Sequence, residues 1–192
     1  EEVFNRAEDR MYRQKLMESS SVRSAILSSL TSTLREKSFE TEEHVERTRN
    51  LAIGLGKRLG LSESWRVALS LMATLHDIGK IAAPDDILTK AGPLTVQEWE
   101  TIRKHPEVGY RIIRASPDLA PIAEDVLSHH EWWDGSGYPR GLKGEAIPLA
   151  ARIIALIDAY DAMLHPHPPT VAMTKKEAIE ELWRRAGSQF DP

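Results

Sequence analysis

Histidine and aspartate residues stand at four places in otherwise apolar, helix-like sequence, either singly or as adjacent pairs. They are His76, Asp77, His105, His129, His130 and Asp158. Imidazoles and carboxylates without any thiolate are the ligands that a hydrolytic centre with two or more transition metal ions uses. A buried polar group without a partner costs about 2–7 kcal/mol, so such residues in apolar sequence need a ligand or a hydrogen bond. The pattern therefore predicts a metal-dependent hydrolase.

The first of these pairs falls where an apolar helix is expected to end. Adjacent residues on a helix diverge by about 100°, so His76 and Asp77 can serve one centre only where the helix is ending. The two oxygens of Asp77 could bridge two ions about 3.5–4 Å apart. Lys80 follows one turn later and could neutralise a phosphate or protonate a leaving oxygen. Alone, such a pair is more often a surface pair, but the downstream histidines favour a catalytic role.

The bulk composition is that of an ordinary globular chain. Its 192 residues are 41% hydrophobic and 28% charged, enough for one sizeable core with or without an appendage. The net charge of −4 argues against a nucleic-acid binder, which usually has a basic excess. The chain has no cysteine, which excludes disulfides and thiolate chemistry and suits a reducing compartment. We therefore expect a cytoplasmic location and no nucleic-acid partner.

No membrane segment is expected, because no apolar run approaches the roughly 18–20 residues that cross a bilayer. No signal peptide is visible, and the first residue is Glu1 rather than methionine. We therefore expect the sequence to be a fragment of a longer protein.

Helical spacing of apolar residues predicts a mostly α fold. Helices are expected over 42–59, from Ser62 to 76, from Thr95 onward, in two segments punctuated by Pro106 and Pro117, over 149–163 and over 175–185. A loop rich in glycine and proline spans 134–148. No strand pair and no internal repeat is predicted.

Residues 1–36 are expected to be connector helices. Residues 1–18 are strongly charged and have too little apolar face to fold alone. Residues 22–34 have apolar side chains at helical spacing, which favours a core-facing helix over the alternative, the seam of a homodimer. We therefore divide the sequence into a connector, 1–36, and a catalytic domain, 37–192.

The ligand set and the loop after it resemble a known family. His76-Asp77, His105, His129-His130 and Asp158 follow the pattern of HD phosphohydrolases. The loop 134–139, Asp-Gly-Ser-Gly-Tyr-Pro, is similar to the signature of the HD-GYP subfamily. The resemblance extends from about residue 40 to the end of the sequence, and the motifs occur in the expected order.

This resemblance implies an HD-type multi-helix bundle with two or three divalent metal ions, most often iron or manganese. It implies hydrolysis of cyclic di-GMP to pGpG and/or GMP in bacterial second-messenger signalling. The implied ligands are His76, Asp77, His105, His129, His130 and Asp158. Asp77 would bridge the metals and Lys80 would assist at the phosphate, so these two are the expected catalytic residues.

The resemblance also implies additional ligands and substrate contacts. Glu40 and His44 occupy the positions of a third-metal ligand pair and share a helix face, although a solvated, charged helix start has the same spacing. Asp85 occupies the position of another ligand. The implied substrate-binding residues are Lys80, Gly137, Tyr138, Pro139, Asp161 and His167. Gly135 and Gly137 are expected to permit positive φ in a loop that shapes the pocket wall.

One segment departs from the family pattern. Where members usually have Thr-Ser-Asp-Arg-Pro-Tyr-Arg, with basic residues that bind the substrate phosphates, this chain has residues 164–170, Leu-His-Pro-His-Pro-Pro-Thr. His167 and Thr170 stand at the two basic positions, and each lost charge-assisted contact costs about 1.5–3 kcal/mol. The substrate contacts of this segment are therefore in doubt.

Four explanations remain open for this departure. Lys80, Arg140 or Lys143 could compensate in a cyclic di-GMP hydrolase, or the substrate could be another cyclic or linear dinucleotide. The domain could instead be a regulatory or protein-interaction module, or the segment could have been altered for crystallisation. The retained ligand set favours an enzyme. Residues 7–13 also resemble the end of a GGDEF domain, so an upstream sensory or GGDEF domain is the expected partner in the same chain.

Overall fold

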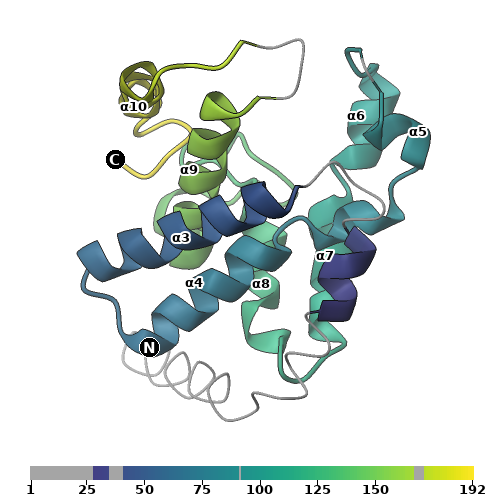
Figure 1. Cartoon of the computed structure of the whole chain (residues 1–192), viewed down its shortest axis with the longest axis horizontal. Coiled ribbons are helices and arrows are strands. Elements are labelled where there is room, and N and C mark those ends of the chain that lie inside the picture. Colours follow the sequence, from purple (N-terminus) through teal and green to yellow (C-terminus); the bar gives the residue numbers. More distant parts are fainter. Residues whose placement is uncertain (1–27, 35–40, 91, 167–170) are drawn as a thin grey trace.

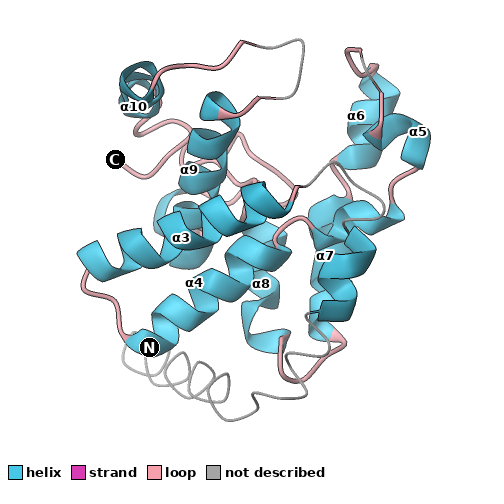
Figure 2. Cartoon of the chain, in the orientation of Figure 1, coloured by secondary structure: helices cyan, strands magenta, loops and turns pink. Residues whose placement is uncertain are grey.

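The computed structural model describes residues 28–34, 41–90, 92–166 and 171–192, and within these ranges the chain is built from helices (Figure 2). The predicted mostly α fold is confirmed, and the β structure of these ranges is one isolated bridge between Ala186 and Phe190. The helices are α3 (Glu42–Arg58), α4 (Glu63–Leu75), α5 (Asp85–Leu88), α6 (Val96–Ile102), α7 (His105–Arg114), α8 (Ala123–Ser128), α9 (Leu149–Leu164) and α10 (Lys175–Arg184), with 3-10 turns η1 (Ile78–Ala82), η2 (Ala120–Ile122) and η3 (Gly144–Ala146).

Polar side chains begin several helices where the sequence predicts them. The Ser62 hydroxyl accepts a hydrogen bond from the backbone N–H of Trp65 at the start of α4. Thr95 and Glu98 form a full capping box at the start of α6. Each cap satisfies N–H groups that have no partner within the helix. The predicted helices 42–59, 149–163 and 175–185 agree with α3, α9 and α10 to within one residue at each end.

The hydrophobic core lies where α3, α4 and α9 meet, with α8 packed against α4 and α9, and α7 packed against α8 (Figure 1). Along α4 the fully buried side chains Ala68, Leu69, Met72 and Leu75 recur three or four residues apart, which places them on one face. This buried face leads directly into His76, so packing of α4 in the core fixes where the His76 side chain lies.

Residues 28–34 are helical and contribute to the same core. Leu34 is buried, and Leu30 packs against the core from its edge. The rest of the predicted connector, 1–27 and 35–36, lies outside the described residues. The division at residue 36 and the homodimer through the connector therefore stay predictions.

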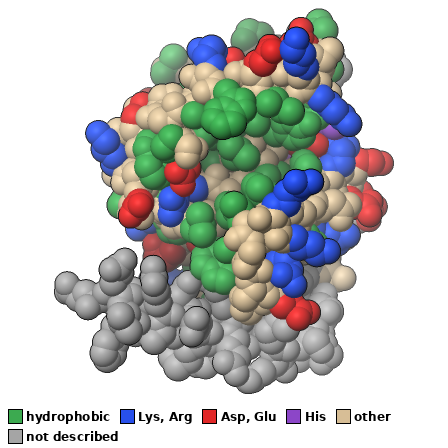
Figure 3. Space-filling model, turned by 90° about the vertical axis from the view of Figure 1, so that its left-hand side faces the viewer, with side chains coloured by type: hydrophobic (Ala, Val, Ile, Leu, Met, Phe, Trp, Pro, Cys, Tyr) green, Lys and Arg blue, Asp and Glu red, His purple; other side chains and the backbone are tan. Residues whose placement is uncertain are grey.

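Hydrophobic side chains also gather on one face of the surface (Figure 3). Over the whole described surface, the exposed large hydrophobic residues include Leu59, Ile179 and Trp183. A groove of about 950 Å³ lies between α3 and α9, with Leu51 and Leu164 among the side chains that line it. Among the described helices, none combines the length and the apolar character that crossing a bilayer would require.

The backbones of η1 and α7 cross closely, and this crossing brings His76 and Asp77 close to His105. A Cβ atom on Gly79 would lie 1.9 Å from the carbonyl oxygen of His105 and 2.6 Å from the backbone N of Gly109. Only glycine permits an approach this close, because any side chain would overlap backbone atoms that cannot rotate away. Gly79 therefore allows η1 to pack on the start of α7, which sets Asp77 beside His105.

The close crossing makes a prediction about stability. Gly79→Ala is expected to lower the free energy of unfolding by about 1–3 kcal/mol or more, because the added methyl group forces η1 away from α7. Urea denaturation measures this change. Gly54→Ala in α3 is the matched control, since its Cβ would have nothing within 4 Å, and it is expected to raise stability by about 0.5–1 kcal/mol. Equal effects at the two positions would contradict the account.

Candidate metal centre

Segments from across the sequence bring the predicted ligands to one place, and five of the six residues stand at or next to a helix end. His76 is the C-cap of α4, Asp77 follows it before η1, and His105 is the first residue of α7. His129 is the C-cap of α8, with His130 next to it, and Asp158 comes from the middle of α9. The structure thus brings together all six residues that the sequence singled out first.

The ligand atoms form two clusters, within each of which all atoms lie within 4.8 Å of one another. The Asp77 cluster consists of Asp77, His105, His129 and His130. The Asp158 cluster consists of His44, His76 and Asp158. His44, expected only as a ligand of a third metal, therefore lies in the same group as two of the main candidates.

The carboxylate of Asp77 stands between the two clusters. Its Oδ1 is 3.0 Å from Nε2 of His105 and 3.9 Å from Nε2 of His129. Its Oδ2 is 3.4 Å from Nε2 of His76, which in turn is 3.7 Å from Oδ1 of Asp158. One oxygen thus faces each cluster, the arrangement that a carboxylate bridging two cations requires.

Three of the candidate ligand histidines are oriented by backbone carbonyl groups. Nδ1 lies 3.2 Å from the Ala73 carbonyl in His76, 2.8 Å from the Ile102 carbonyl in His105 and 2.6 Å from the Val126 carbonyl in His129. A carbonyl oxygen can only accept, so Nδ1 carries the hydrogen in each ring. When such a ring is neutral, its lone pair is on Nε2, which faces the clusters, as metal ligation requires. Burial would lower the pKa of His76, but the carboxylates of Asp77 and Asp158 raise it well above its usual value, so a bound cation would displace the second proton of this ring.

Burial and neighbouring charges set the protonation of the Asp77 cluster. Burial lowers the pKa of His129 to about 3 and that of His130 well below its usual value, so both rings are neutral at pH 7. Burial alone would raise the pKa of Asp77, but Lys80 and His76 outweigh it and hold this pKa well below its usual range. His129 and His130 therefore face the Asp77 carboxylate as neutral imidazoles.

The buried polar atoms of the site fit divalent cations. Among the described residues, Nε2 of His76 and Oδ1 of Asp77 are buried and make no hydrogen bond. Such atoms are unfavourable without a partner, and a cation in each cluster would supply one, since Nε2 of His76 belongs to the Asp158 cluster and Oδ1 of Asp77 faces the Asp77 cluster. A cavity of about 530 Å³ opens beside them, lined also by Arg47, Lys80 and His165. A small anionic molecule could therefore reach the clusters.

Comparison with known families agrees with this geometry. The sequence matches the family described as HD domain over residues 28–192. The chain belongs to the HD domain family.

Several relatives of this HD domain are curated or solved. It is 41% identical over 168 residues to the cyclic di-GMP phosphodiesterase response regulator RpfG of Xanthomonas campestris pv. campestris, which covers 86% of this chain and 44% of the relative. It is 38% identical over 165 residues to the 3'3'-cGAMP-specific phosphodiesterase 2 of Vibrio cholerae, which covers 85% and 32%.

A solved structure has the same fold. The cyclic GMP-AMP-specific phosphodiesterase V-cGAP3 of V. cholerae superposes with a TM-score of 0.64 and 25% sequence identity, over 87% of this chain and 45% of that one. The chain spans less than half the length of each of these relatives.

The loop that follows His130 in this HD domain is anchored by Glu131. The buried carboxylate of Glu131 accepts hydrogen bonds from the backbone N–H groups of Arg140, at 2.7 Å, and Leu142, at 3.0 Å. Positive φ is confirmed for Gly135, at +88°, but the expectation was wrong for Gly137. Gly137 is required for a different reason, because its Cβ would lie 2.2 Å from the backbone N of Trp132.

Tyr138 in this loop packs on a ligand histidine. Its ring stacks on His130 with centroids 4.9 Å apart, and Cζ of Arg103 lies over the ring, 4.5 Å from its centroid. Burial raises the pKa of Tyr138 to about 12, so the side chain stays a neutral phenol at pH 7. Pro139 follows through a cis peptide bond. The loop thus forms the wall behind His130.

The remaining candidate residues lie in different surroundings. Asp161 is buried and bonded to Arg47, His44 and His165. Asp85 is exposed in the first turn of α5 and belongs to neither cluster. Glu40 and His167 lie outside the described residues. The ligand roles of Glu40 and Asp85, and the substrate contacts of Asp161 and His167, stay predictions.

Sequence reasoning missed Arg47, Arg103 and Glu131. Arg47 contacts Asp161, which lies 114 residues later in the chain. No local sequence spacing predicts that pair. Arg103, the C-cap of α6, lies beside the ring of Tyr138, which is distant in the sequence. Glu131 had a usable signal, since an acidic residue that opens a loop rich in glycine is well placed to accept the loop's N–H groups.

The anchoring role of Glu131 can be tested by truncation. Glu131→Ala leaves the N–H groups of Arg140 and Leu142 without an acceptor, and each such group costs about 1–3 kcal/mol. Urea denaturation should show this loss, and hydrogen exchange should be faster at both amides. Glu124→Ala is the control, because Glu124 bonds only the exposed guanidinium of Arg140 and should change stability by about 0–1 kcal/mol. Unchanged exchange in Glu131→Ala would exclude the anchor.

Proposed function

We propose that this HD domain is the catalytic part of a metal-dependent cyclic dinucleotide phosphodiesterase of the HD-GYP type. The proposed reaction is hydrolysis of cyclic di-GMP to pGpG and/or GMP in bacterial second-messenger signalling. The observation that carries the proposal is the Asp77 carboxylate, which faces one ligand cluster with each oxygen. The names of several relatives, which are cyclic dinucleotide phosphodiesterases, point to the same substrate class.

The proposed ligands are the seven residues of the two clusters, which would hold two or three divalent cations. Iron or manganese suits a set of imidazoles and carboxylates without thiolate. Glu40 and Asp85 are proposed as further ligands. Bound cations supply a nucleophile at neutral pH and stabilise negative charge on a phosphodiester.

The residues of the chain would orient the substrate and move a proton. The cavity of about 530 Å³ beside the clusters falls within the roughly 300–1,000 Å³ that is usual for small-molecule sites. Lys80 reaches it with Nζ 2.5 Å from Oδ2 of Asp77, so it would stabilise or protonate the departing ribose oxygen. Gly137, Tyr138 and Pro139 would close the wall behind His130 and exclude water from that side.

Hydrolysis of 3'3'-cGAMP is the second candidate. Two observations favour it. Three curated relatives are named as 3'3'-cGAMP-specific and one solved relative as cyclic GMP-AMP-specific, and this chain lacks both usual basic residues at positions 167 and 170. A regulatory module with impaired substrate binding is the alternative from another class. We further propose a cytoplasmic signalling protein with an upstream sensory or GGDEF domain and a homodimer through the connector.

The proposal predicts that Asp77→Asn abolishes turnover while the fold persists. The amide keeps the shape of the carboxylate but cannot bridge two cations, so hydrolysis should fall at least about 100-fold, since even outer partners of metal ligands contribute 10–100-fold. Chromatography of pGpG and GMP from chain loaded with Mn²⁺ measures the rate. Asp191→Asn is the matched control, because it removes the same charge from an exposed ion pair with Arg152 and should leave turnover unchanged.

The two substrates are compared in the same assay. Faster turnover of cyclic di-GMP supports the first candidate, and faster turnover of 3'3'-cGAMP supports the second. A wild-type chain that binds Mn²⁺ but hydrolyses neither nucleotide would overturn both and favour the regulatory module.

A further inference from the structure

His44 is held differently from His76, His105 and His129. Those three donate Nδ1–H to the carbonyl three residues earlier. His44 lies in the first turn of α3, and the carbonyl three residues before it already accepts a helix hydrogen bond. The Thr41 carbonyl accepts the N–H of Val45 at 3.2 Å, as helix formation requires. Nδ1 of His44 instead lies 2.8 Å from Oδ2 of Asp161. A side chain therefore does for His44 what the backbone does for the others.

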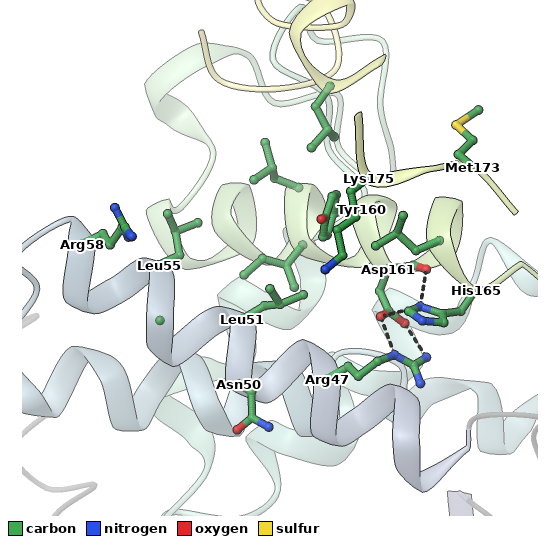
Figure 4. A pocket seen from close by; sticks show the side chains of 15 residues that line it. Arg47, Asn50, Leu51, Leu55, Arg58, Tyr160, Asp161, His165, Met173 and Lys175 are labelled. Atoms are coloured by element: carbon green, nitrogen blue, oxygen red, sulfur yellow. Dashed lines mark hydrogen bonds and ion pairs between the residues drawn. The ribbon is translucent and has the colours of Figure 1, made fainter. Parts of the chain in front are cut away.

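Asp161 is itself fixed by a two-point contact. The guanidinium of Arg47 donates from Nε to Oδ1 at 2.7 Å and from Nη2 to Oδ2 at 2.8 Å (Figure 4). Nδ1 of His165 lies 3.1 Å from Oδ1 on the other side. The Asp161 side chain is only 3% exposed. Both carboxylate oxygens of Asp161 thus accept hydrogen bonds from protein donors. The two parallel hydrogen bonds from the guanidinium fix the plane of the carboxylate.

The same helix face supplies both partners of this carboxylate. His44 and Arg47 are three residues apart on α3, so they lie side by side, and both reach Asp161 on α9. Because a carboxylate accepts, Nδ1 of His44 carries the hydrogen and Nε2 keeps its lone pair. That Nε2 is 3.7 Å from Oδ1 of Asp158. Asp161 thus turns the ligand atom of His44 toward the Asp158 cluster.

We propose that Asp161, held by Arg47, is a positioning residue that orients His44 for cation binding in the Asp158 cluster and does not contact the substrate. The proposal deepens the proposed function and rests on it only in treating the Asp158 cluster as a cation site. Carboxylates that receive the second N–H of a ligand histidine typically contribute 10–100-fold to metal affinity. Loss of Asp161 should therefore weaken cation binding in the Asp158 cluster and leave cation binding in the Asp77 cluster unchanged.

The test is a calorimetric titration of metal-free chain with Mn²⁺ alone, with bound equivalents counted by elemental analysis. His44→Ala serves as the reference that removes a ligand of the Asp158 cluster. Asp161→Asn keeps the shape but loses the charge and one acceptor, so it should weaken Mn²⁺ binding about 10–100-fold at the site that His44→Ala affects. The second site should bind Mn²⁺ as in the wild type.

Two further variants separate positioning from general damage. Asp191→Asn removes a carboxylate paired with an arginine elsewhere and should bind Mn²⁺ as the wild type does. Arg47→Gln removes the fork but leaves Asp161, so it should weaken the same site by a smaller factor. If Asp161→Asn fails to fold, as circular dichroism would show, Arg47→Gln decides the question by the same criterion.

The outcomes separate this inference from the proposed function. Wild-type Mn²⁺ affinity and stoichiometry in Asp161→Asn and Arg47→Gln would overturn the positioning role, whatever the turnover. A raised KM for the cyclic dinucleotide with unchanged Mn²⁺ binding would make Asp161 a substrate contact instead. Weakened Mn²⁺ binding supports the positioning role even if the chain hydrolyses no cyclic dinucleotide, because the readout is metal binding and not catalysis.

Discussion

The structure of this HD domain depends on keeping one buried carboxylate charged. Asp77 is 5% exposed, and burial by itself would favour its neutral form. The charge is retained because Lys80 lies within hydrogen-bond distance and His76 and His105 face its two oxygens. Those groups arrive from α4, η1 and α7, so the packing of these elements is set by electrostatics as well as by apolar contact. Gly79 lets these elements meet, because a larger residue would overlap the backbone of α7 and separate η1 from it.

Helix ends are what make the ligand set possible. The last carbonyl groups of an α-helix lack partners within the helix. The carbonyls of Ala73, Ile102 and Val126 belong to the last turns of α4, α6 and α8, and a histidine just beyond each helix donates to them. Ending a helix thus satisfies a carbonyl and orients an imidazole at once. His44 is near a helix start, where no such carbonyl is available, and this explains why its partner is a carboxylate from α9.

The sequence predicted the parts of this site that follow from residue type and order. Apolar periodicity and caps such as Ser62 and Thr95 are local signals, and the structure agrees with them. The residues that the sequence singled out as ligands do lie together, while their ligand roles stay a prediction. Contacts between distant segments were not predictable in this way. Arg47 contacts Asp161 only because α3 packs on α9. Gly137 is required because the backbone of Trp132 lies against it, and not because its own φ is positive. Such requirements arise from tertiary packing, which a single sequence does not display.

The charges of the described cavity bear on how a dinucleotide could be held there. Arg47 is committed to Asp161, and Lys80 lies against Asp77, so both of these cations already face a carboxylate. With His167 and Thr170 at the usual basic positions, little permanent positive charge remains on the described wall for two phosphates. Cations at Asp77 would change this balance, because they compete with Lys80 for the same carboxylate and add charge of their own. In this chain, the attraction of an anionic substrate therefore depends on whether cations occupy the metal centre. Phosphate-binding arginines would attract the substrate whether or not cations are bound.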